Sequence, residues 1–261
     1  MRHLTVCLTI AAVLAGTPVL ADELSAPNSI EAWSLERIAE LGREIYHHDI
    51  AAWVATDVLL EGTDGVPPPD LRGWIVTPQD DGLVVRFLRL DGEVLRPGWD
   101  VLVQNGVAGS LVVAADTVLS DEDQARFQAR QTAIANLGAL QCTSSFNSVV
   151  LEDPDGEGWL VWLLAATTEA GVIPVGGHYR FRLTADGRNI IMRDQLSNGC
   201  LNMRPEAEAV GMVVTHMLSD TPVETHVFLS LINGMALYVA AGDFIYAVEG
   251  DRISAVAPIP Q

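Results

Sequence analysis

The chain has 261 residues and carries 34 acidic side chains against 15 basic ones, which gives a formal net charge of −19 at pH 7. Every basic side chain is an arginine, because the sequence contains no lysine. This excludes chemistry that needs a lysine amine, such as a Schiff base, a phosphate-loop lysine or a Ser-Lys dyad. So negative a charge also argues against nucleic acid as a partner, since its phosphates would be repelled.

The first 21 residues have the pattern of a secretory signal peptide. A basic start precedes an apolar run over Leu4–Ala15, and "PVLA" ends in a small-x-small cleavage pattern. The run is too short to span a bilayer, although an uncleaved anchor is the alternative. We therefore expect cleavage after Ala21, a periplasmic or secreted protein, and no membrane span after cleavage. Residues 22–261 would then form one exported domain, with a subdivision near 120–140 as the other arrangement.

Two cysteines, Cys142 and Cys200, follow the predicted signal peptide. An even count in an oxidising compartment favours a disulfide between them, and two separate buried thiols are the alternative. The chain has no Cys-x-x-Cys pair, so a redox role is not expected.

Two principal helices are predicted. Apolar residues three to five positions apart indicate a helix over about 29–47, with Ser29 as its N-cap. The second helix covers about 120–138, where Ser120 and Asp123 have capping-box spacing and Gly138 ends the pattern.

Most of the remaining chain is predicted to be strand and turn. Asp-Gly and Asn-Gly pairs recur between short β-type runs, which include "HYRFRLTA", "VGMVVTHML" and "HVFLSLI". The predicted fold class is therefore α+β, mainly antiparallel β-sheet built from hairpins, with the two helices packed on it.

The segment "DPDGEGW" at 153–159 places acids at alternate positions, as at the start of a calcium loop. An EF-hand would need a glutamate at the twelfth position of the loop, where this chain has Leu164. An acidic hairpin turn is the preferred interpretation, and we predict neither a metal site nor a cofactor.

Three residues are weak candidates for acid–base catalysis. Asp57 alternates with apolar neighbours in "AAWVATDVLL", so its carboxyl is a candidate general acid or base unless it reaches solvent or an arginine. His216 and His226 lie in "THMLSDTPVETHVF", which is interpreted as two strands. Strand alternation then points these histidines in opposite directions, and a shift of one residue in the register would reverse this.

The main candidate site is the segment "HYRFRLTADGRNIIMRDQ". If Asp186 and Gly187 form a two-residue turn, Arg180 lies directly opposite Arg193. The same face then carries the candidate ligand-binding residues, and the other face is apolar. Two facing arginines repel, so a negative group is expected between them, either an internal carboxylate or an external anion. The candidate ligand-binding residues are His178, Arg180, Arg182 and Arg193.

These patterns favour a soluble exported protein without catalytic activity, a binding or accessory protein. Its arginine-lined strand face would bind an anionic small molecule or an acidic protein surface. A secreted hydrolase that uses an aspartate and a histidine is the alternative, and a structural component of the cell envelope is a third hypothesis.

Overall fold

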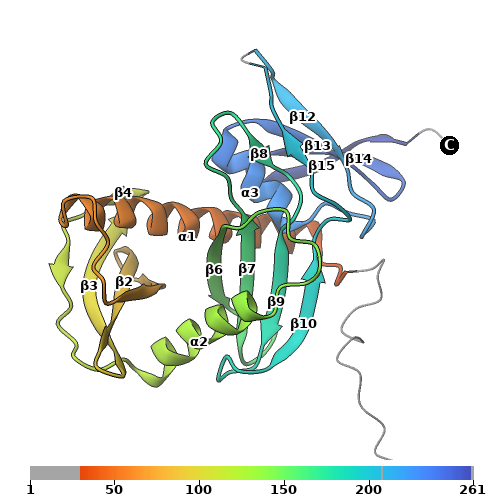
Figure 1. Cartoon of the computed structure of the whole chain (residues 1–261). Helices are drawn as coiled ribbons and strands as arrows, with labels where there is room; N and C mark the ends of the chain where they lie inside the picture. The colour runs from red at the N-terminus through yellow and green to blue at the C-terminus, as the bar shows by residue number, and fades with distance from the viewer. Residues whose placement is uncertain (1–29, 207, 260–261) are drawn as a thin grey trace, which may run out of the picture.

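The computed structural model describes residues 30–206 and 208–259, so the predicted signal peptide and Ser29 lie outside the described part. The described chain contains three helices and mainly antiparallel sheets, which confirms the α+β prediction (Figure 1). None of its helices combines the length and the apolar character that crossing a membrane requires.

Helix α1 (Leu35–Glu61) is the longest element and extends well beyond the predicted end at residue 47. Its N-cap is Ser34, whose Oγ accepts the N–H of Arg37 at 3.2 Å. The segment "AAWVATDVLL", in which the alternation around Asp57 suggested a strand, continues this helix. Its buried positions Ala51, Ala55 and Leu59 recur every four residues, as on one face of a helix.

The C-terminal half of α1 packs on the first sheet. Small residues such as Ala51 and Ala55 let the helix approach the buried side chains of Val85 and Phe87. The strands of this sheet are β1 (Leu71–Gln79), β2 (Gly82–Asp91), β3 (Val94–Gln104), β4 (Val107–Ala108) and β5 (Val112–Val113).

The middle sheet is buried on both faces (Figure 1). On one face lies α2 (Asp121–Ala135), which begins at Ser120 as predicted, with the Ser120 Oγ accepting the N–H of Asp123 at 3.0 Å. On the other face lie α1 and α3 (Glu224–Asn233). The strand order is β10 (Ile190–Gln195), β9 (Tyr179–Leu183), β7 (Trp159–Ala165) and β6 (Phe146–Glu152).

The third sheet contains a parallel pair that the sequence did not indicate. The run "HVFLSLI", predicted as a strand, forms the helix α3 and connects β12 to the parallel strand β13. Parallel neighbours need such a crossover, and a short, mainly apolar run does not distinguish a buried helix from a buried strand. The strands are β12 (Gly211–Thr215), β13 (Ala236–Ala241), β14 (Phe244–Glu249) and β15 (Arg252–Pro258).

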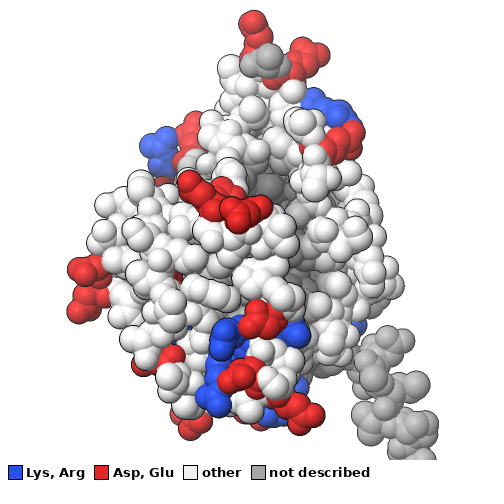
Figure 2. Space-filling view, turned by 60° about the vertical axis from the view of Figure 1, so that its left-hand side comes forward, with Lys and Arg blue, Asp and Glu red and all other residues white. Residues whose placement is uncertain are grey.

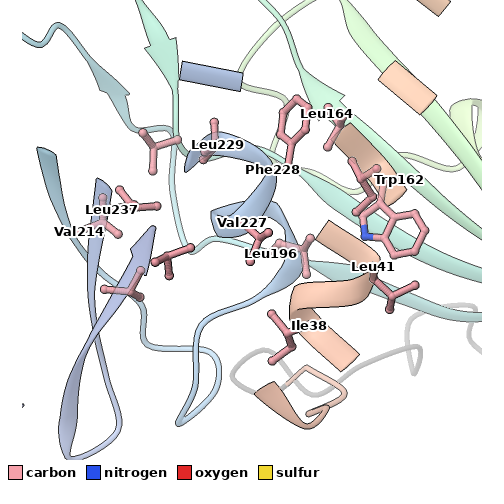
Figure 3. Close-up of a cluster of buried hydrophobic side chains, with 14 of the residues drawn as sticks. Ile38, Leu41, Trp162, Leu164, Leu196, Val214, Val227, Phe228, Leu229 and Leu237 are labelled. Carbon is pink, nitrogen blue, oxygen red and sulfur yellow. The ribbon is translucent and has the colours of Figure 1, made fainter. Parts of the chain in front are cut away.

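The main core forms where α1, α3 and two sheets meet. Figure 3 shows Ile38 and Leu41 of α1, Val227 of α3 and Trp162 of β7 in this cluster. The helices cross closely at Gly42, where an added Cβ would lie 2.4 Å from the Val227 Cβ. A side chain at this position would therefore force the two helices apart.

The predicted disulfide is present between Cys142 and Cys200, whose Cα atoms are 5.2 Å apart. It ties the segment before β6 to the loop after β10. Close to it, a short ladder pairs β8 (Ile173–Pro174) with β11 (Asn202–Met203).

Loss of this disulfide should reduce the free energy of unfolding by about 4 kcal/mol, because the bond closes a long loop in the unfolded chain. The cysteines are 58 residues apart in the sequence. The measurement is urea unfolding of the Cys142→Ala/Cys200→Ala variant beside the oxidised wild type, with reduced wild type as the control. Equal midpoints for all three proteins would contradict the expected stabilisation.

Candidate functional site

The β9–β10 hairpin begins in the predicted register and then departs from it. Leu183 lies opposite Ile190, as expected from the Asp-Gly turn. A β-bulge directly after Ile190 then shifts the pairing by one residue, so Arg180 lies opposite Asp194 and not opposite Arg193. The predicted repulsion between facing arginines is thus replaced by an attraction between opposite charges.

The bulge also separates the four predicted ligand-binding residues. Arg193 lies opposite Phe181, on the face covered by α2, and its guanidinium donates to the carbonyl of Asn136 at 3.5 Å. Arg180 and Arg182 remain on the face covered by α1 and α3. A one-residue shift of register moves a side chain to the other face of the sheet, which is why a shared face for all four residues is wrong.

Arg180 is the centre of a buried ionic network. It is 1% exposed, and its Nη2 lies 2.5 Å from Asp194 Oδ2, while its Nη1 lies 3.1 Å from Glu224 Oε2. The guanidinium stacks on the ring of Trp33 at 3.8 Å, and Trp162 Nε1 donates to Glu224 Oε1 at 2.7 Å. Two internal carboxylates therefore neutralise the charge of Arg180.

Arg182 is also paired within the protein. Its Nε lies 2.6 Å from Asp153 Oδ2, and its Nη1 lies 3.0 Å from Glu31 Oε2. Asp153 belongs to the acidic segment after β6, and its second oxygen accepts the N–H of Asp155 at 3.1 Å. This segment connects the antiparallel strands β6 and β7, as an acidic hairpin turn should.

Arginines elsewhere follow the same pattern. Arg86 lies within 2.8 Å of both Asp100 and Asp116 and within 3.5 Å of Asp123. Figure 2 shows one face on which blue arginine atoms gather at the lower end, directly beside red carboxylates. Among the described residues, acids of the protein itself thus compete with any external anion for these arginines.

His216 and His226 lie together, although strand alternation predicted opposite directions. Their ring centroids are 5.1 Å apart and their planes are almost perpendicular. His226 Nδ1 accepts the N–H of Val223 at 3.0 Å, and His216 Nε2 lies 2.9 Å from the Ser219 hydroxyl. Burial lowers the pKa of His216 to about 4 and the pKa of His226 well below its usual value, so both rings are neutral at pH 7.

Asp57 does not join these histidines. It is exposed on α1, one helical turn after the exposed Trp53, in the half of the helix that packs on the first sheet. The Asp–His pair predicted for a hydrolase is therefore not assembled from these residues. In the described part of the chain, no group of three or more His, Cys, Asp or Glu residues is placed to hold a metal ion.

A cavity of about 710 Å³ opens between α1, the edge of β6 and β7, the loops on either side of these strands, and α3. We call it the α1–α3 groove. Its apolar wall includes Leu164, Phe228 and Leu229, which Figure 3 places in the core between β7 and α3. None of the described residues that line it is an arginine. Its polar lining consists of Asp49, Thr143, Ser144, Ser145, Asn147, Thr167, Thr168, His178 and Asn233.

Asp49 is the single charged group among these lining residues. It is 7% exposed, and burial raises the pKa of its carboxyl to about 6, although a hydrogen bond with the Asn147 side chain lowers this pKa. The carboxyl is therefore mainly ionised at pH 7 and lacks an ion-pair partner among the described residues.

His178 lies in the same groove and is 2% exposed. Its Nδ1 accepts the N–H of Ala165 at 2.9 Å, so the proton of the neutral ring is on Nε2. Burial lowers the pKa of His178 to about 4, and the neighbouring Pro174 carbonyl raises it somewhat. The Pro174 carbonyl does not meet full hydrogen-bond geometry with Nε2, and no other described residue does, so this buried donor lacks a well-formed hydrogen bond.

In comparisons with known proteins, no family model, no curated protein and no solved structure matches this chain. The site is therefore defined by its geometry alone. The sequence analysis singled out His178, but for an anion site, and it missed Asp49. When the helical pattern is extended past residue 47, Asp49 falls on the same buried face as Ile45 and Ala52. This position of a carboxylate among buried residues is the sequence signal that could have identified Asp49.

Proposed function

We propose that the protein is an exported binding protein without catalytic activity, and that the α1–α3 groove holds its ligand. The observation that carries this proposal is the buried Nε2–H of His178, a residue that lines the groove, which lacks a well-formed hydrogen bond within the described residues. An unsatisfied buried polar group costs about 1–3 kcal/mol, and a bound acceptor would recover this cost. The buried carboxylate of Asp49 in the same groove supports the proposal.

The state of His178 favours binding over proton transfer. One ring nitrogen already accepts a backbone N–H and the other carries the proton, so the neutral ring has no position that takes up a proton from a substrate. Its pKa of about 4 also keeps the ring neutral at pH 7. A hydrolase that uses this histidine as its base would need the opposite arrangement.

The arginine face is a weaker candidate for the ligand site. Arg180 and Arg182 each contact two internal acidic residues, and displacing those would leave buried carboxylates unpaired. Export remains part of the proposal and rests on the pattern of residues 1–21.

Filling the groove should abolish binding. Thr168 lines the groove, so Thr168→Trp should block it, while Ser110→Trp adds the same side chain at an exposed position outside it. Isothermal titration calorimetry would use one probe from each of four classes: cellobiose, putrescine, succinate and leucine. We expect at least one probe to bind the wild type and Ser110→Trp, and to bind Thr168→Trp at least tenfold more weakly.

Two results would contradict the proposal that the groove binds the ligand. If no probe class binds, or if Thr168→Trp and Ser110→Trp bind every probe equally, the groove is not the binding site. Thermal unfolding of both variants shows whether each is folded.

A further inference from the structure

We infer that the ligand of the α1–α3 groove is a neutral polyhydroxylated ring, that is, a carbohydrate. This inference rests on the proposed function, because it names the chemical class that the groove selects. It follows from three features of the lining: paired donor and acceptor groups, exposed aromatic surface, and the absence of cations among the described lining residues.

The two buried polar groups make opposite demands on a ligand. His178 Nε2–H is a donor that lacks a well-formed hydrogen bond, while the Asp49 carboxylate, to which Asn147 already donates, can accept further hydrogen bonds. A hydroxyl group meets both demands, since it donates one hydrogen bond and accepts others. An ammonium group only donates, and an ionised carboxylate only accepts, so neither satisfies His178 and Asp49 together.

Further hydroxyl and amide groups line the same groove. The side chains of Ser144, Ser145 and Thr168 make no hydrogen bond within the described residues, so their hydroxyls are available to a ligand. The amide of Asn147 adds both a donor and an acceptor beside Asp49. A ligand with several hydroxyls at fixed positions could use many of these groups at once.

The aromatic surface suits the faces of a sugar ring. Trp53 lines the groove and is 59% exposed, which is unusual for so large an apolar side chain and leaves its indole open to a ligand. Phe228 of α3 also lines the groove and is buried. Small-molecule sites combine such apolar walls with a few polar groups, and the volume of about 710 Å³ is within their usual range of roughly 300–1,000 Å³.

Charge argues against the competing classes. A phosphate or carboxylate ligand would meet Asp49 and none of the arginines, because Arg180 and Arg182 are paired elsewhere. A diamine such as putrescine would find one carboxylate for its two charges. Neither ligand would supply both an acceptor for His178 and a further donor for Asp49.

Calorimetric titration with cellobiose, maltose and N,N′-diacetylchitobiose tests the inference, with putrescine and glucose 6-phosphate as the cationic and anionic comparisons. We expect at least one neutral disaccharide to bind. Asp49→Asn should weaken that binding at least tenfold, because it removes a charged hydrogen-bond acceptor. Asp57→Asn is the matched control, since it removes an exposed carboxylate from the same helix outside the groove and should leave binding unchanged.

His178→Phe and Trp53→Ala test the other two contacts, and each should weaken sugar binding. Because Trp53 is exposed, Trp53→Ala should fold, and it tests the carbohydrate inference even if His178→Phe does not fold. Binding of putrescine or glucose 6-phosphate, blocked by Thr168→Trp and without any sugar binding, would overturn the carbohydrate inference and leave the proposed function standing. If Asp49→Asn, Trp53→Ala and Thr168→Trp all leave sugar binding unchanged, the binding site lies outside the groove. That result would overturn both the carbohydrate inference and the proposed function of the groove.

Discussion

Replacing Arg180 with alanine should lower the free energy of unfolding by about 3–5 kcal/mol, which is enough to unfold many domains of this size. The substitution leaves Asp194 and Glu224 buried without their counter-charge, at 2% and 0% exposure. Burial already raises the pKa of Asp194 although Arg180 acts to lower it. Without the arginine, the two buried carboxylates would have no counter-charge between them.

Two other arginines supply graded controls. Arg182→Ala breaks a pair in which the arginine side chain is 19% exposed, and should cost less than Arg180→Ala. Arg204 is 60% exposed and pairs with the exposed Glu169, so Arg204→Ala should change stability by less than about 0.5 kcal/mol. The measurement is urea unfolding at pH 7, where an effect of Arg180→Ala no larger than that of Arg204→Ala would contradict the network.

A second test replaces Asp194 and Glu224, the acids that pair with Arg180, by their neutral amides. The triple variant Arg180→Leu/Asp194→Asn/Glu224→Gln should be more stable than Arg180→Leu alone, because no charge is left unpaired in the core. Failure of the two added substitutions to recover any stability would show that packing on Trp33, rather than charge, is the main role of Arg180.

Acidification should destabilise the protein strongly between pH 6.5 and pH 4. Burial lowers the pKa of His48, His178 and His216 to about 4, whereas each would titrate near 6.5 in the unfolded chain. Within this window the unfolded state binds protons that the folded state does not, so the free energy of unfolding falls as the pH falls. Each histidine accounts for about 3 kcal/mol of the loss by pH 4.

Asp49 acts in the opposite direction, as does Asp194, whose pKa is also raised by burial. The pKa of Asp49 is raised to about 6 in the folded state, so the folded protein takes up this proton first and gains relative stability as the pH falls below 6. One such carboxyl offsets about one histidine, and His226, whose pKa is also lowered, adds to the loss. The net expectation is a loss of about 5 kcal/mol between pH 7 and pH 5.

Urea unfolding at pH 7, 6 and 5 measures this dependence. His216→Gln should flatten the profile, because it removes one of the buried titrating groups. His47→Gln is the control, since His47 is exposed beside the buried His48. Equal or greater stability at pH 5 would show that the histidines are protonated in the folded protein.

Local features of the sequence predicted several parts of this structure. The second helix begins at Ser120 because that side chain satisfies a backbone donor of the first turn, a purely local effect. Strand alternation correctly assigned Tyr179 and Phe181 to one face of β9 and Arg180 and Arg182 to the other. The disulfide followed from the number of cysteines and the expected compartment.

The elements that were missed depend on packing between distant segments. The end of α1 and the helical state of α3 are set by the surfaces that bury them, since Ala51 and Val227 suit a buried helix and a buried strand alike. The α1–α3 groove is lined by residues of α1, β6, β7, α3 and the loops between them, so Asp49 and His178 come together in one cavity only after the chain has folded.

The bulge after Ile190 separates the part of the β9–β10 register that local sequence determines from the part that tertiary packing determines. Within the hairpin, alternation and the Asp-Gly turn determine the register up to this residue, and they place Arg193 opposite Arg180. In the folded protein Arg180 lies opposite Asp194 and not opposite Arg193. A buried arginine needs a carboxylate, and the extra residue in β10 brings Asp194 to this position. The sequence by itself thus determined that β9 and β10 form and where the cations lie along them. The tertiary structure decided which acids neutralise them, since the cost of burying a charge depends on every segment packed around it.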